Sequence, residues 1–121
     1  SLRLRRFVAI SKAHVARIVA MAEAAAVPLL VVWVPAPDEM FPPVRVTAAM
    51  QLFELGRRML RDMGDAAPAM TFADLSAIPH TPDWRRRQGT LRLSDGHFNA
   101  EGSAWYAALA APALAEFLLR P

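Results

Sequence analysis

Residues 27–35, VPLLVVWVP, decide the fold of this chain. Within them, Leu29 to Val34 is an unbroken run of aliphatic, β-branched and aromatic residues bounded by Pro28 and Pro35. A run with no polar residues at alternate positions is typical of a strand that is covered on both faces in a parallel sheet. The run is also too short to cross a bilayer as a helix. It therefore predicts a buried strand in a layered α/β domain.

The flanks of this strand predict a helix before it and a loop after it. From Leu4 to Ala26, apolar residues recur at three- and four-residue steps, which indicates an amphipathic helix. Pro28 is expected to end that helix, because proline cannot continue the hydrogen-bond ladder. Pro35 to Pro43 contains four prolines and predicts a loop at the carboxyl end of the strand, where open α/β sheets bind ligands.

A second helix and strand follow, and a helix closes the chain. The apolar spacing predicts a helix from about Thr47 to Met63, with Gly64 as its C-terminal stop. Ala69 to Leu75 predicts a shorter strand, and Ile78 to Ser94 a long polar loop. The final helix is expected from about Ala100 to Leu119. The order is α-β-α-β-α, with parallel strands.

Composition limits the class of protein. The 121 residues are 55% hydrophobic, which indicates one folded domain over 1–121, and the sequence has no apolar run long enough for a membrane span. The net charge of +3 comes from scattered arginine clusters without aromatic platforms or a reading helix, so nucleic-acid binding is not expected. The absence of cysteine fits a cytoplasmic protein and a disulfide-free bacterial periplasmic or secreted protein equally well, and the compartment stays open.

The stretch with the clearest chemistry is Leu93 to Gly102, LSDGHFNAEG. Asp95 and His97 are two residues apart, so in an extended segment their side chains leave the backbone on the same side. The carboxylate is then expected to accept a hydrogen bond from the imidazole Nδ1–H, which leaves Nε2 to act as a base. Asn99 is expected to cap the last helix, and Gly102 to let its first turn approach a neighbouring strand closely.

This stretch and the alanine-rich helix after it resemble the C-terminal block of SGNH (GDSL-type) hydrolases and acyltransferases. The preceding order of elements is similar to the second half of that family's flavodoxin-like, three-layer fold. The resemblance implies that the chain is the C-terminal half of such a domain. It also implies that His97 is the general base and Asp95 its orienting acid. Only Gly96 separates them, where the family usually has two residues, and this is similar to the branch related to alginate-type O-acetyltransferases.

The resemblance implies serine-dependent ester hydrolysis or O-acyl (acetyl) transfer, yet the family's serine block and oxyanion-hole blocks do not occur in these residues. None of the serines is expected on a strand-to-helix nucleophile turn: Ser1, Ser11, Ser76, Ser94 and Ser103. We therefore expect the nucleophile in the remaining half of the domain or in another chain, which packs against strand 29–34. The alternative is a non-catalytic partner-binding or assembly module derived from the same fold. A nucleotide binder is disfavoured because no glycine-rich phosphate loop is present.

Other residues have weaker signals. Trp84 and Arg87, in the loop before His97, are candidates for binding a small-molecule or carbohydrate ester, although a solvated basic loop is the commoner meaning of such a run. Asp74 ends the second strand and is either catalytic or a turn cap. His14 is expected to be partly buried and structural. The histidine spacing predicts no metal site, and no cofactor is expected.

Overall fold

The computed structural model describes residues 2–35, 47–77, 91 and 97–120. Within them the elements are α1 (Leu2–Ala24), β1 (Leu29–Trp33), α3 (Ala48–Ala66), β2 (Met70–Asp74), the 3-10 turn η1 (Leu75–Ala77) and α5 (Ala100–Leu118). The predicted α-β-α-β-α order is confirmed for these residues. The two predicted loops lie outside the described residues, apart from Pro35 and Leu91.

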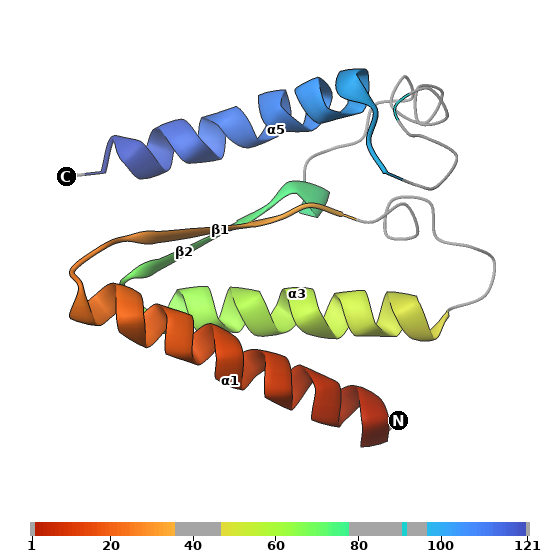
Figure 1. The fold of residues 1–121 in the computed structure, drawn as a ribbon, viewed down its shortest axis with the longest axis vertical. Coiled ribbons are helices and arrows are strands. Elements are labelled where there is room, and N and C mark those ends of the chain that lie inside the picture. Colours follow the sequence, from red (N-terminus) through yellow and green to blue (C-terminus); the bar gives the residue numbers. More distant parts are fainter. Residues whose placement is uncertain (1, 36–46, 78–90, 92–96, 121) are drawn as a thin grey trace.

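The two strands form a parallel pair between layers of helix. Leu29 lies opposite Met70 and Trp33 opposite Asp74, and the Leu29 N–H donates to the Ala69 carbonyl at 2.7 Å. Figure 1 shows α5 on one face of the sheet and α3, with α1 beyond it, on the other. The structure is therefore a mixed α/β arrangement with parallel strands, as predicted. Within the described residues, β1 has β2 as its one strand neighbour.

Successive side chains of the strands serve opposite helix layers, as the pleat of a strand requires. Val32 packs against the core beside α5. Trp33 points the other way, and its ring lies 3.6 Å from the position that a Cβ would take at Gly56 of α3. All of β1 is partly buried. The prediction that both faces of this strand lie under other elements is thus confirmed for Leu29–Trp33, but it is wrong for Val34, which follows the strand and is 45% exposed.

The end of α1 has a backbone motif that the sequence did not predict. The helix ends at Ala24, and Ala26 has a positive φ of 54°. The Ala26 N–H donates to the Glu23 carbonyl at 3.1 Å, and the Val27 N–H donates to the Ala22 carbonyl at 2.9 Å. These two bonds form a Schellman motif, which usually has glycine at the left-handed position. Pro28 follows the motif, so the helix is already closed before the proline.

The prediction that Gly64 stops the second helix is wrong. Thr47 caps α3 by accepting the Met50 N–H at 3.2 Å, and the helix then runs past Gly64 to Ala66. A Cβ at Gly64 would lie 3.0 Å from the Phe72 Cβ. The glycine therefore permits close packing of α3 on β2, and its role is in tertiary contact.

The core lies where the carboxyl ends of the strands meet the start of α5. Leu75 of η1, Leu91 and Tyr106 of α5 form the buried cluster, and Val32 and Phe98 pack against it. The less exposed side of α5 follows the predicted four-residue steps at Trp105, Leu109, Ala113 and Phe117. Pro112 lies on the exposed side, and the helix continues through it without interruption. No helix in the described part of the chain is long and apolar enough to cross a membrane.

Candidate functional site

His97 lies at the entrance to α5, two residues before the helix cap. The segment that leads into α5 is at the same end of the sheet as the carboxyl ends of β1 and β2 (Figure 1). His97 is exposed. This is the edge where parallel α/β sheets bind their ligands. The structure therefore places an exposed histidine at this edge of the sheet.

Asn99 caps α5, as predicted. Its side-chain oxygen accepts the Gly102 N–H at 2.8 Å, and its carbonyl accepts the Ser103 N–H at 2.9 Å to begin the helix ladder. Its own N–H donates to the Leu91 carbonyl at 3.1 Å. Asn99 is therefore held from both sides, and these bonds fix the point at which the chain enters α5.

Gly102 is buried and makes a close approach, but its neighbour differs from the prediction. A Cβ at this position would lie 2.1 Å from the Leu91 carbonyl oxygen, far inside the contact distance of two heavy atoms. The expected neighbour was a strand, and the observed neighbour is the backbone of Leu91. The sequence could not reveal this, because the approach depends on how the loop before His97 returns to α5.

Aromatic contacts support the residue next to His97. The Phe98 and Tyr106 ring centroids are 4.2 Å apart with an interplanar angle of 38°. Trp105 meets Tyr106 edge-on, with centroids 5.0 Å apart. Tyr106 is buried. Phe98 is consequently packed against the core while His97 next to it stays exposed.

Three of the predicted site residues, Asp95, Trp84 and Arg87, lie outside the described residues. The pairing of Asp95 with His97 stays a prediction, as does the role of Trp84 and Arg87 in substrate binding. His14 is exposed on α1, so its expected partial burial is wrong. The described residues contain no group of three or more His, Asp or Glu side chains that would hold a metal ion.

Asp74 is engaged in a network at the carboxyl end of β2. One carboxylate oxygen accepts the Ser76 N–H at 3.0 Å and the Ser76 hydroxyl, which caps η1. The other accepts from Arg61 at 2.8 Å and lies 3.7 Å from Arg57. The Asp74 side chain is only 10% exposed. Of the two roles that the sequence left open, turn capping is the one that these contacts support.

Arg57 links this network to the exposed side of α3, and sequence analysis missed it. Its guanidinium donates to the Ser76 hydroxyl at 2.6 Å and also pairs with Glu54. Hydrogen bonds from Arg57 and then Arg58 hold the pKa of Glu54 below its usual value. Arg57 and Arg61 are four residues apart on one helix, which is the signal that places both beside β2.

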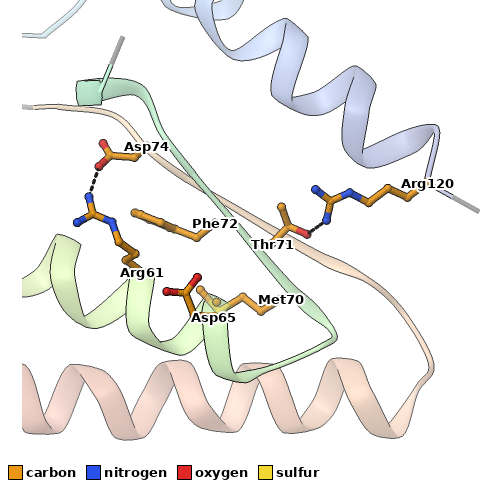
Figure 2. A pocket seen from close by; sticks show the side chains of 8 residues that line it. Arg61, Asp65, Met70, Thr71, Phe72, Asp74 and Arg120 are labelled. Atoms are coloured by element: carbon orange, nitrogen blue, oxygen red, sulfur yellow. Dashed lines mark hydrogen bonds and ion pairs between the residues drawn. The ribbon is translucent and has the colours of Figure 1, made fainter.

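A pocket of about 380 Å³ lies between the C-terminal half of α3, β2 and the end of α5, and Figure 2 shows the side chains that line it. Three of its charged side chains have partners, since Arg61 pairs with Asp74 and Arg120 donates to the Thr71 hydroxyl at 2.8 Å. Among the described residues that were predicted to form the site, Asp74 lines this pocket, whereas His97, Asn99 and Gly102 do not. The pocket is therefore best explained as part of a charged sheet edge, which discourages strand addition.

An apolar groove of about 390 Å³ lies between α1 and α3 beneath Trp33. Phe7 and Val8 of α1 and Phe53 of α3 are among its lining residues. Phe7 is 55% exposed, and Met21 further along α1 is 71% exposed. Exposed apolar side chains of this size, next to a groove, are typical of a surface that another segment covers.

No model of a known protein family matches the chain, and no curated protein or solved structure is significantly similar to it.

Proposed function

We propose that this chain contributes the histidine arm of a serine-dependent esterase or O-acyltransferase of the SGNH type. In this proposal His97 is the general base and Asp95 orients it. The serine nucleophile and the oxyanion donors belong to residues outside the chain. The α-β-α-β-α order of the described elements and their parallel strands support the proposal.

The observation that carries the proposal is the position of His97. It immediately precedes Phe98 and the capped start of α5, at the carboxyl edge of two parallel strands. His97 is exposed at this edge, and the cap beside it is fixed by the hydrogen bonds of Asn99. A general base has to be both accessible and fixed in position.

The chemistry assigned to the site is acyl transfer through a covalent intermediate. His97 removes the proton of the serine hydroxyl as its oxygen attacks the ester carbonyl, and it then donates that proton to the departing alcohol. The acyl-serine is next attacked by water or by an acceptor hydroxyl, whose proton passes to His97 and then to the serine oxygen. Hydrolysis and transfer differ only in this second nucleophile.

The serines of the described residues support an external nucleophile. Ser11 faces the groove between α1 and α3, and Ser103 is within the first turns of α5. Ser76 is at the sheet edge, but its hydroxyl is held by Asp74 and Arg57. None of the three has the exposed strand-to-helix turn that presents a nucleophilic serine.

The experiment is hydrolysis of p-nitrophenyl acetate by the native protein, compared with its His97→Ala and His14→Ala variants. His14 is the matched control because it is also an exposed histidine, on α1. Loss of a general base is expected to reduce kcat/KM by at least about 100-fold, and His14→Ala is expected to leave it unchanged. Equal activity in wild type and His97→Ala, or no esterase activity in the wild type, would reject the proposal.

A second candidate function is a non-catalytic module that binds a partner. The observation that favours it is the exposed apolar side of α1 beside the groove, which includes Phe7, Ile10, Ile18 and Met21. In that case the covering segment packs on α1 and on strand 29–34 for assembly alone. The same esterase assay separates the two candidates, because a binding module has no activity that depends on His97.

A further inference from the structure

We infer that Leu91 and Gly102 are positioning residues for His97, acting through one backbone contact. This inference rests on the proposed function for its catalytic consequence, while its structural part is independent. The contact is the approach of the Leu91 carbonyl oxygen to the first turn of α5. It is defined by two observations, the Asn99 N–H bond to that oxygen and the space left by the missing Cβ of Gly102.

The Leu91 carbonyl is fixed on its own side by the core. The Leu91 side chain is 1% exposed and is buried with Leu75 and Tyr106. Leu75 directly follows β2, and Tyr106 is one helical turn beyond Gly102. Moving the carbonyl away from α5 would therefore disturb close-packed side chains, which interiors resist.

The first turn of α5 is fixed on the other side by the cap. Asn99 donates its N–H to Leu91 at 3.1 Å and accepts the Gly102 N–H at 2.8 Å. One oxygen, one cap residue and one glycine thus form a closed arrangement in which each position depends on the other two. Any side chain at residue 102 would push the Leu91 carbonyl and the Asn99 N–H apart.

This arrangement reaches His97 through a single residue. Phe98 connects His97 to the cap, and its ring is packed on Tyr106 at a centroid distance of 4.2 Å. The backbone of His97 is therefore tied through Phe98, which packs on Tyr106, to Asn99, which the contact holds. Gly102 does not touch a reacting group, and its effect on the imidazole passes entirely through this segment.

The test compares Gly102→Ala with Gly56→Ala in the native protein. Gly56 is the matched control, since it is also a helical glycine but an added Cβ there would be at an ordinary 3.6 Å from Trp33. The readout is the set of imidazole NMR resonances of His97, with those of His14 as internal reference. We expect Gly102→Ala to shift the His97 resonances, and Gly56→Ala to leave them unchanged.

If Gly102→Ala does not fold, Leu91→Ala replaces it, because this variant keeps the carbonyl but removes the side chain that anchors it. Unchanged His97 resonances in a folded Gly102→Ala or Leu91→Ala variant overturn the inference. In the esterase assay, the folded variant is expected to lower kcat by about 100-fold with little change in KM, the cost of a misplacement of about 1 Å. A wild type without esterase activity rejects the proposed function, whereas the NMR comparison still decides whether the contact positions His97.

Discussion

Gly64 of α3 lies so close to Phe72 of β2 that a Cβ on the glycine would be 3.0 Å from the Phe72 Cβ. The helix and the strand can pack this closely because Gly64 has no Cβ methyl group. Alanine is normally favoured over glycine inside a helix by about 0.5–1 kcal/mol. At residue 64 this gain in helix stability is opposed by overpacking against Phe72, which costs about 1–3 kcal/mol.

We therefore expect Gly64→Ala to have a free energy of unfolding at least about 1 kcal/mol below that of Gly56→Ala, since overpacking acts at only one of the two sites. Urea denaturation of both variants and the wild type measures the difference. Equal stabilisation by the two alanines would show that α3 moves away from β2 at no cost.

The left-handed residue at the end of α1 gives a prediction of the opposite sign. Ala26 has a φ of 54°, a conformation that costs an L-residue about 1–2 kcal/mol and costs glycine much less. Ala26→Gly is thus expected to raise the free energy of unfolding by up to about 1 kcal/mol, after the greater flexibility of glycine in the unfolded chain is included. Ala20→Gly, on an exposed position inside the same helix, is the control and should lower stability. A loss of stability in both variants would contradict the Schellman motif.

Asp74 is expected to be a structural residue. Asp74→Asn weakens the ion pairs with Arg61 and Arg57 and removes charge from the bond to Ser76. Charge-assisted hydrogen bonds contribute about 1.5–3 kcal/mol each when one partner is lost, so a decrease of that order in unfolding free energy is predicted. Asp62→Asn, on an exposed position of α3, should change it by less than about 0.5 kcal/mol. If Asp74→Asn abolishes esterase activity while stability is unchanged, Asp74 belongs to the catalytic site.

The pKa of Glu54 gives a dependence on pH. Because Arg57 and Arg58 lower this pKa in the folded chain, the ionised carboxylate stabilises the fold above the unfolded pKa. That contribution is lost as the pH falls through the folded pKa. Glu54 is 43% exposed, so solvent limits the contribution to roughly 0.2–1 kcal/mol.

Glu54→Gln is therefore expected to be less stable than the wild type at pH 7, and the difference in unfolding free energy is expected to be smaller at pH 3, as measured by chemical denaturation. Glu116→Gln, which removes a more exposed pair with Arg120, serves as the control for a loss of surface charge. A difference for Glu54→Gln that is the same at both pH values would contradict the ion pair.

The sequence predicted most elements of the fold because their signals are local. The apolar run at Leu29 to Val34, the periodic helices and the Asn99 cap all depend on neighbouring residues. The role of Gly64 was missed because a glycine near the end of a helical pattern has the same local appearance whether it ends the helix or packs against a strand. The left-handed Ala26 was missed because alanine is uncommon at that position.

The candidate site likewise has features that the local sequence predicted and contacts that it did not predict. His97 and its cap were identified from a ten-residue stretch, and the structure places them at the sheet edge. The contact of Gly102 with Leu91, and the network of Asp74 with Arg57 and Arg61, join residues from different elements. Such contacts depend on how the layers pack, and no pattern along the chain specifies them.

The most direct test of the central claim is covalent labelling of the native protein with a fluorophosphonate, which reacts with serines activated by a neighbouring base. Intact mass and peptide mapping then locate the label. We predict one labelled serine outside residues 1–121, with labelling lost in His97→Ala and kept in His14→Ala. No labelled serine, or labelling that persists in His97→Ala, would contradict the assignment of His97 as the general base.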